Sequence, residues 1–504
     1  MQYQSTRSSR IRFTSMEAIK QGLSAEGGLF VPIEIPKLRT DELEPLINRT
    51  YQERAEHILS LFLTDFSGDD IRDCVYNAYR ADNFSSEEIA PVVPLGGSLY
   101  CQELWHGPTA AFKDMALQIL PHFMTTAIKR TGEEKQVMIL TATSGDTGKA
   151  ALEGFKDVPG TFVLVFYPQE GVSAMQRLQM VTQEGGNVKV CAVRGNFDDA
   201  QAGVKAIFRD TEINSELSRM GYQFSSANSI NWGRLVPQIV YYFSAYLDMV
   251  KKGYLTLGDS VNVVVPTGNF GNILAAYYAK SMGLPIGKLI CASNENNVLT
   301  DFIKTGVYDR NRPFHTTISP SMDILISSNL ERLLFELADG DDSQIRSLMD
   351  QLAREGSYRV EASALKKLQS HFYGGYASED ETRAAIRQTF LDYGYTMDPH
   401  TAVGKKVYDD YVGETGDSSK TILVSTASPF KFPRDVLSAI KGNECILGRE
   451  EADLLCDLSE ISKMEVPFPL KGIKARPVLH SNLCAKEDMR LEVFSAIKDK
   501  VKDI

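Results

Sequence analysis

The chain has 504 residues, of which 43% are hydrophobic and 24% are charged. These fractions are typical of soluble globular proteins and exclude a largely disordered chain, while the length predicts two or three domains. The formal net charge of −11 argues against nucleic acid or an anionic membrane as the main partner, because both require a basic face. No stretch approaches the ~20 consecutive apolar residues of a membrane span.

The seven cysteines form no CxxC pair, and the closest two are Cys445 and Cys456. A disulfide framework or a zinc site would need denser spacing. We therefore expect reduced and mostly buried thiols, no metal site and a cytoplasmic protein. The basic residues near the N-terminus precede no apolar segment, so we expect no secretory signal.

Residues 1–95 predict a lead-in domain rich in helices and loops. After it, short apolar runs alternate with helical stretches. Buried parallel strands form continuous apolar runs, and the helices between them provide the crossovers, so this alternation predicts a doubly wound α/β sheet. The predicted strands are residues 137–140, 162–166, 188–193, 261–265, 289–292 and 422–425.

Between about residues 325 and 415 the strand pattern gives way to amphipathic, charge-rich helices, which predicts a helical insertion. We expect a smaller α/β domain over residues 96–225 and a larger one over residues 226–504 that contains this insertion. Residues 440–504 carry many charges and no catalytic pattern, and we expect them to complete the larger domain.

The first chemical motif is HGPTAAFKD at residues 106–114, with a helical stretch that begins near Lys113. Its apolar surroundings, which include Phe112, lower the pKa of a lysine, and a lysine that attacks a carbonyl needs such a pKa. A lysine at a helix start is more often simply solvated. The motif therefore needs a second element to support it.

That element is VPTGNFGN at residues 265–272, between a predicted strand and a helix. Glycines let successive backbone N–H groups converge, and the helix N-terminus adds positive potential. The pattern predicts a phosphate-binding turn. An ordinary strand-to-helix turn is the alternative.

The third motif is TATSGDTG at residues 141–148, which follows a strand where open α/β sheets place ligands. It resembles a nucleotide P-loop, but Thr143 stands where the first glycine is required and Ala150 where Ser or Thr is required. No GxGxxG fingerprint follows the predicted strands. The turns therefore favour a small phosphorylated cofactor and substrate over ATP or NAD.

These motifs, together with GNFDDAQ at 195–201 and SINWGR at 229–234, occur in the order seen in threonine synthases. The resemblance runs from about residue 3 to residue 433, and the length is similar to the longer fungal and bacterial form. It implies an α/β enzyme of fold-type II, like the tryptophan synthase β subunit, with pyridoxal 5′-phosphate (PLP) as cofactor.

The resemblance also implies the reaction, which is conversion of O-phospho-L-homoserine and water to L-threonine and phosphate by γ-elimination and β-addition, the last step of threonine biosynthesis. The alternative is a threonine synthase-like phospho-lyase that releases 2-oxobutyrate, ammonia and phosphate. An inactive scaffold is disfavoured, because the lysine and the phosphate turn are both present. We expect a monomer or a homodimer, with no nucleic acid and no membrane as partner.

The resemblance assigns the site residues as well. Lys113 would be the catalytic residue, linked to the cofactor and moving protons. Thr426 would bind the pyridine nitrogen, and the cofactor phosphate would be held by Gly268, Asn269, Phe270, Gly271 and Asn272. The substrate carboxylate would be bound by Ser144, Gly145, Asp146 and Thr147.

For the substrate phosphate the candidates are Arg234 and the neighbouring Asn231, since a guanidinium can bind phosphate bidentately. A structural salt bridge is the alternative for Arg234. His400, which follows a proline, is expected to form a helix cap or a core hydrogen bond rather than a metal site.

Overall fold

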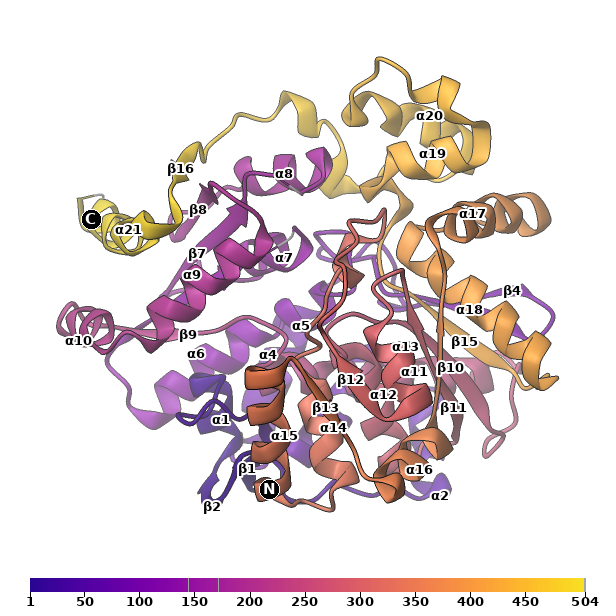
Figure 1. Ribbon diagram of the computed structural model, residues 1–504, viewed down its shortest axis with the longest axis horizontal. Helices are drawn as coiled ribbons and strands as arrows, with labels where there is room; N and C mark the ends of the chain where they lie inside the picture. The colour runs from indigo at the N-terminus through magenta and orange to yellow at the C-terminus, as the bar shows by residue number, and fades with distance from the viewer. Residues whose placement is uncertain (144, 171, 503–504) are drawn as a thin grey trace.

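A computed structural model describes residues 1–143, 145–170 and 172–502 (Figure 1). Its two large sheets have the strand orders β14-β11-β10-β15-β5-β4 and β16-β8-β7-β6-β9. Ser144, one of the predicted carboxylate-binding residues, lies outside the described residues. No helix in the described part of the chain is both long enough and apolar enough to span a membrane.

The six-stranded sheet is parallel apart from the β4–β5 hairpin. On its central strand, Val263 and Val265 face α11 (Trp232–Lys251) and α12 (Gly271–Met282), while Val264 faces α18 (Pro399–Thr415). Burial on both faces explains the unbroken apolar run. The strands are β4 (Val92–Gly96), β5 (Leu99–Glu103), β10 (Val261–Pro266), β11 (Ile286–Ser293), β14 (Phe372–Tyr376) and β15 (Thr421–Ser425).

The five-stranded sheet is entirely parallel. Val163 and Val165 pack on the side of α7 (Asp146–Gly154), and Leu164 packs towards α9 (Phe197–Arg209) and α21 (Met489–Lys502). The strands are β6 (Gln136–Ala142), β7 (Thr161–Pro168), β8 (Val188–Val193), β9 (Tyr222–Ser225) and β16 (Asn482–Cys484).

The N-terminal segment forms an antiparallel sheet of β1 (Tyr3–Ser5), β2 (Ser8–Phe13) and β3 (Phe30–Pro32). Its Tyr3 ring packs 5.3 Å from Trp232 on α11, which ties the lead-in to the core. The other helices include α1 (Ser15–Gln21), α2 (Thr40–Leu43), α3 (Tyr51–Phe62), α4 (Gly68–Ala78), α5 (Asp114–Leu117), α6 (Leu120–Thr131), α8 (Ala174–Val181), α10 (Thr211–Arg219), α13 (Val298–Thr305), α19 (Pro433–Lys441) and α20 (Leu454–Ser462).

The α/β class is confirmed, and all six predicted strands lie within β6, β7, β8, β10, β11 and β15. Three strands lie outside their predicted domains. β4 and β5 belong to the six-stranded sheet rather than to the lead-in over 1–95 and the small domain over 96–225, and β16 pairs with β8 rather than completing the larger domain. Neither β5 nor β16 is an apolar run, because β5 carries Gln102 and Glu103 and β16 has only three residues. Which sheet these strands join depends on their backbone hydrogen bonds, and the pattern of apolar residues does not predict those.

The predicted insertion is mainly helical, with α14 (Leu330–Leu337), α15 (Asp342–Glu355), α16 (Ala362–His371), α17 (Glu379–Tyr393) and α18. It also supplies the edge strand β14 and the short strand β13 (Ser357–Arg359), which pairs with β12 (Val307–Asp309). β14 was not predicted from the sequence because two glycines interrupt its apolar run. A Cβ at Gly375 would lie 2.6 Å from the Val407 side chain, so the glycine allows α18 to approach the sheet closely.

Candidate active site

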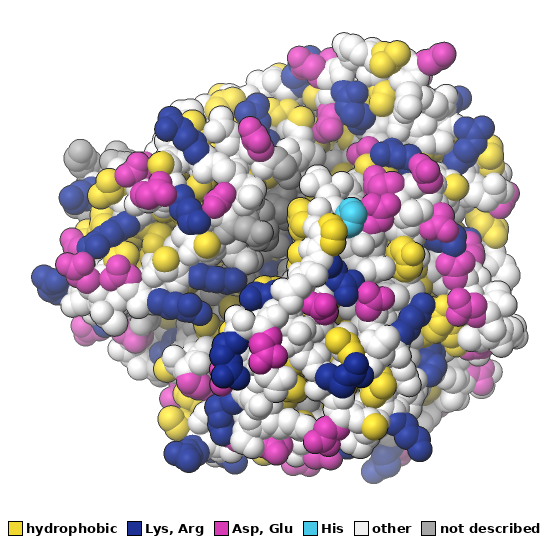
Figure 2. All heavy atoms as spheres, viewed as in Figure 1, with side chains coloured by type: hydrophobic (Ala, Val, Ile, Leu, Met, Phe, Trp, Pro, Cys, Tyr) yellow, Lys and Arg dark blue, Asp and Glu magenta, His cyan; other side chains and the backbone are white. Residues whose placement is uncertain are grey.

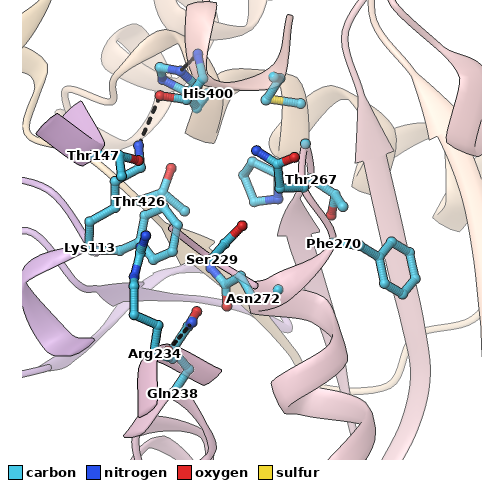
Figure 3. A pocket seen from close by; sticks show the side chains of 17 residues that line it. Lys113, Thr147, Ser229, Arg234, Gln238, Thr267, Phe270, Asn272, His400 and Thr426 are labelled. Carbon is cyan, nitrogen blue, oxygen red and sulfur yellow. Dashed lines mark hydrogen bonds between the residues drawn. The ribbon is translucent and has the colours of Figure 1, made fainter. Parts of the chain in front are cut away.

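A cavity lies at the carboxyl ends of the six-stranded sheet, where parallel strands place ligands (Figure 3). Lys113 follows β5, the 267–272 turn follows β10, and Thr426 follows β15. On the face drawn in Figure 2, the surface is hollowed between two lobes of the molecule. The cavity is lined by Phe112, Lys113, Thr147, Ser229, Arg234, Gln238, Pro266, Thr267, Gly268, Asn269, Phe270, Gly271, Asn272, Ser321, Met322, His400 and Thr426.

Lys113 stands immediately before α5 and is buried. Its Nζ donates to Oδ2 of Asp146 at 3.2 Å and to Oγ of Ser321 at 3.1 Å. Burial lowers the pKa of Lys113, and the nearby charges of Lys431 and Arg234 act in the same direction against the opposing effect of Asp146. The amine is therefore shifted towards its neutral, nucleophilic form.

Asp146 is a buried carboxylate shared by several donors. Its Oδ1 accepts from Gln176 Nε2 at 2.8 Å and lies 2.8 Å from Lys431 Nζ. Although burial favours the neutral acid, the charges of Lys113 and Lys431 hold the pKa of Asp146 well below its usual range. Asp146 is thus an ionised acceptor that fixes the position of the Lys113 amine.

The turn over residues 267–272 is anchored through its carbonyl groups. Ser327 Oγ donates to the Gly268 carbonyl at 2.7 Å, and the backbone and side chain of Asn329 donate to the Asn269 carbonyl at 3.1 and 3.0 Å. Within the described part of the chain, the backbone N–H groups of 268–272 donate to no protein acceptor. The turn therefore presents free donors at the N-terminus of α12, as an anion site requires.

Two backbone features allow this turn to form. Phe270 caps α12 in the left-handed region with φ of 63°, and a Cβ at Gly268 would lie only 2.6 Å from the Ser321 carbonyl oxygen. Glycine at 268 lets the 320–322 segment pack directly against the turn.

The lysine segment is tied to the end of β15. Phe112 N–H donates to the Thr426 carbonyl at 2.8 Å, and Ala111 forms an isolated bridge with Ala427. Thr426 lines the cavity, and its hydroxyl forms no hydrogen bond with a residue that the structure describes. That hydroxyl is available to a ligand.

The predicted carboxylate turn lies beside Lys113. Thr143 Oγ1 accepts from the N–H groups of Gly145 at 3.0 Å and Gly148 at 2.9 Å, which closes the turn. Gly145 has φ of 139°, and a Cβ there would lie 2.5 Å from the Gln176 side chain. Thr147, on the first turn of α7, lines the cavity.

Of the two residues predicted for the substrate phosphate, the structure brings only Arg234 to the cavity lining. Asn231 is buried outside the cavity lining and is the N-cap of α11, where its Oδ1 accepts from Gly233 N–H at 2.8 Å. Its Nδ2 donates to the carbonyls of Ile19 and Ser226, both at 3.0 Å. Asn231 therefore positions the helix that carries Arg234.

Sequence reasoning missed Ser321, Lys431 and Gln176, and it gave His400 only a structural role. His400 Nε2 accepts from Ser321 N–H at 3.2 Å, so the neutral ring carries its proton on Nδ1, which lies 2.8 Å from Asp398 Oδ1. Asp398 also caps α18. Of the two structural roles expected for His400, the core hydrogen bond is confirmed, whereas the cap is formed by Asp398, and His400 lines the cavity as well.

Comparisons with known proteins cover most of the chain. The family profile described as "Threonine synthase N terminus" matches residues 2–79, "Pyridoxal-phosphate dependent enzyme" matches residues 86–427, and "Threonine synthase, C-terminal" matches residues 401–471. The second profile alone covers more than half of the chain and includes all the cavity residues described above.

Among individual proteins, threonine synthase-like 1 of Homo sapiens is 42% identical over 500 residues, an alignment covering 96% of this chain and 64% of the relative. The chain therefore spans less than two thirds of that relative's length. Threonine synthase of Pseudomonas aeruginosa is 35% identical over 486 residues, covering 95% of this chain and 100% of the relative.

Two solved structures match nearly the whole chain. The PLP-bound threonine synthase from Brucella melitensis has a TM-score of 0.86 and 35% identity, covering 98% of this chain and 99% of its own. The threonine synthase from yeast has a TM-score of 0.88 and 35% identity, covering 100% of this chain and 99% of its own.

Proposed function

We propose, from the finding that the chain belongs to the threonine synthase family of PLP-dependent enzymes, that it converts O-phospho-L-homoserine and water to L-threonine and phosphate. The observation that carries the proposal is the position of Lys113. Its buried amine, with a lowered pKa, opens into the same cavity as the donor-rich turn 268–272.

The cavity residues fit the cofactor. Lys113 supplies the amine for its aldehyde, the free N–H groups of 268–272 supply an anion site for its phosphate, and Thr426 supplies a neutral hydroxyl for its ring nitrogen. When bound, PLP provides an electron sink for the negative charge that develops at the substrate's Cα. The protein residues then have to position the substrate and move its protons.

Lys113 is the proton carrier in this proposal. Its Nζ takes the Cα proton, and loss of a second proton from Cβ expels phosphate from Cγ. A proton is then delivered to Cγ, water adds its hydroxyl at Cβ, and a proton returns to Cα, while the remaining proton of the water balances the departing phosphate. Asp146 and Ser321 hold Nζ between these transfers, since both lie within 3.2 Å of it. The lowered pKa of Lys113 shifts the free amine towards the neutral form that can accept a proton.

The substrate carboxylate is assigned to the turn that begins α7, where Gly145, Asp146 and Thr147 surround the helix N-terminus. Backbone N–H groups at such a terminus attract anions. The carboxylate of Asp146 itself is directed at Lys113 and Lys431. The Asp146 carboxylate therefore holds the lysine. The N–H group of Gly145 is bonded to Thr143, so the N–H groups of Asp146 and Thr147 are the ones assigned to the substrate.

A phospho-lyase stays the second candidate, because the human relative is named threonine synthase-like 1 rather than threonine synthase, which leaves the fate of the intermediate open. Both reactions need the same proton carrier and the same release of phosphate. They differ in whether water adds at Cβ or the product leaves as 2-oxobutyrate and ammonia. The cavity residues described above are common to both.

The test is to incubate the purified protein and PLP with O-phospho-L-homoserine and to measure phosphate, threonine and 2-oxobutyrate in one reaction. Threonine equal to phosphate is the expected result, with neither product from Lys113→Ala and normal activity from the surface control Lys474→Ala. Phosphate accompanied by 2-oxobutyrate would instead assign the phospho-lyase reaction. If the protein binds PLP but releases no phosphate, the proposed substrate is wrong.

A further inference from the structure

The interface between α7 and α8, which lie side by side, is polar although it is buried (Figure 1). Two polar stripes meet there, and each has the i, i+3, i+7 spacing of a single helix face. They consist of Asp146, Lys149 and Glu153 on α7 and of Gln176, Gln179 and Gln183 on and just beyond α8. All but Glu153 are buried. Buried helix faces are normally apolar, so these stripes have a role besides packing the two helices together.

Both ends of the interface are closed by hydrogen bonds between the two stripes. At the inner end, next to the catalytic amine, Gln176 Nε2 donates to Asp146 Oδ1 at 2.8 Å. At the outer end Lys149 donates to the Gln183 side chain and to Glu153 Oε2, the latter at 2.8 Å. The Glu153 side chain is 28% exposed. The interface thus runs from the catalytic amine to the surface.

Gln179 lies between these two ends with both atoms of its amide unpartnered. It is 2% exposed, and its Nε2 and Oε1 bond to no residue that the structure describes. The Oε1 of Gln176, one helical turn earlier, is likewise buried and without a described partner. A buried amide is costly unless it is hydrogen-bonded, and internal water bonds such groups where protein groups do not. Two acceptors and one donor are what a buried water molecule needs.

Lys149 is suited to pass a proton between this amide and the surface. Burial lowers its pKa, and the charge of Lys431 acts in the same direction against the opposing effects of Glu153 and Asp114. The amine is therefore shifted towards its neutral form, which can accept a proton and release it again.

The proposed reaction needs a route for protons away from Lys113. Protons leave Cα and Cβ before one is delivered to Cγ, and a neutral amine can hold only one of them. With cofactor and substrate in the cavity, the route through the cavity mouth is obstructed. The inner end of the polar interface is in contact with the amine, because Asp146 Oδ2 lies 3.2 Å from Lys113 Nζ.

We propose that the α7–α8 interface is a hydrated proton path between Lys113 and the solvent. Along it, the Lys113 ammonium passes a proton to water held by Asp146 and Gln179. That water protonates Lys149, which releases a proton to the solvent past Glu153, and the proton needed at Cγ returns by the reverse sequence. The inference rests on the proposed function. Gln179 is a positioning residue that holds the water and touches neither substrate nor cofactor.

The test uses O-phospho-L-homoserine that carries deuterium at Cα, with the PLP-loaded protein in ordinary water, and measures the deuterium that remains in the product by mass spectrometry. In wild type the deuteron on Lys113 should exchange with solvent, so little should remain. Gln179→Leu places an apolar side chain of similar size in the path. Retention should then rise by roughly 3-fold or more, and kcat should fall while KM stays close to its wild-type value.

Two variants serve as controls for the isotope measurement. Gln179→Ser is polar and leaves room for water, so it should retain as little deuterium as wild type. Gln388→Leu makes the same change on the exposed face of α17 and should also match wild type.

A high-resolution crystal structure tests the path independently of the reaction. It should show ordered water bonded to the Gln179 amide in wild type and none at that position in Gln179→Leu. The unfolding temperature of Gln179→Leu should be no lower than that of wild type, because an apolar group replaces an amide without protein partners.

Two outcomes would overturn the proposal. Unchanged deuterium retention in Gln179→Leu would show that the protons leave through the cavity mouth or with the departing phosphate. A Gln179 amide bonded to protein groups alone, together with a less stable Gln179→Leu, would make Gln179 a packing residue. A wild-type protein that does not convert O-phospho-L-homoserine would refute the proposed function, and the crystal structure would then decide by itself whether the interface holds water.

Discussion

Lys431 Nζ lies 2.8 Å from Oδ1 of Asp146, and both side chains are buried. The other carboxylate oxygen faces Lys113 Nζ at 3.2 Å, so one carboxylate joins two lysines from distant parts of the chain. Lys431 also donates to the Thr109 carbonyl at 3.0 Å, which fixes it independently of Lys113. Asp146 therefore keeps a cationic partner even when Lys113 is uncharged, and Lys431 lowers the pKa of Lys113.

Replacing Lys431 should shift the pH dependence of activity. In Lys431→Met the cation that lowers the pKa of Lys113 is gone, while Asp146, which raises it, remains. The free amine, which is present once substrate is bound, should then need a higher pH to become neutral, so the acid limb of the kcat profile should move to higher pH.

The matched control for that experiment is Lys474→Met, which removes a lysine paired with Glu450 and Asp453 at the surface. Its pH profile should overlay that of the wild type. An acid limb of Lys431→Met that stays in place or moves to lower pH would contradict the role given to Lys431.

The 267–272 turn should not tolerate a side chain at Gly268. A methyl group in Gly268→Ala would lie 2.6 Å from the Ser321 carbonyl oxygen, so either the turn or the 320–322 segment must move. We expect PLP affinity to fall by roughly 10-fold or more, as judged by titration of the apoprotein. Gly413→Ala is the control, because a Cβ there meets nothing within 4 Å and alanine favours the helix. Equal affinities in the two variants would show that close packing at Gly268 is unimportant.

His400 should act by positioning Ser321. Its Nε2 accepts from the Ser321 backbone at 3.2 Å, and Ser321 Oγ lies 3.1 Å from Lys113 Nζ. In His400→Phe this acceptor is lost, and we expect kcat to fall by roughly 10-fold to 100-fold because a small displacement of the amine is costly. His400→Gln, which retains an acceptor, should recover part of the loss. A change confined to KM would argue for direct substrate contact instead.

Away from the cavity, Glu336 on α14 should make stability depend on pH. Burial raises the pKa of Glu336 from 4.5 to about 7, with Lys37 opposing. A folded-state pKa above the unfolded value favours the folded state at low pH, and this contribution is lost as pH rises from about 4.5 through about 7. Glu336→Gln should therefore be more stable than wild type at about pH 8, by up to about 3 kcal/mol, and nearly unchanged at about pH 5. Urea unfolding of both proteins at each pH measures the difference in their free energies of unfolding. An equal difference at about pH 5 and at about pH 8 would refute the raised pKa of Glu336.

The sequence predicted the parts of the fold that depend on local pattern. Val263, Val264 and Val265 identify a buried strand because the run is apolar on both faces, and both faces are covered. β14 and β16 were missed because the first is rich in glycine and the second has only three residues. Their pairing becomes visible only when the chain is folded.

The same distinction applies to the site. The 106–114 and 265–272 motifs each carry their chemistry in adjacent residues, so sequence alone indicated them. Lys431 and Ser321 contact Asp146 from positions more than 170 residues away in the sequence. Neither residue lies in a motif that would predict this contact. Asn231 was predicted to bind substrate because it is polar and close to Arg234 in sequence, whereas the structure uses it as a helix cap.

The lysine that binds the cofactor can be identified directly. The PLP-loaded protein is reduced with borohydride, digested, and analysed by mass spectrometry for the lysine that retains the pyridoxyl group. We expect the label on Lys113, with no stable label in Lys113→Ala. A label on Lys149 or Lys431, the other buried lysines near Asp146 and its helix, would contradict it.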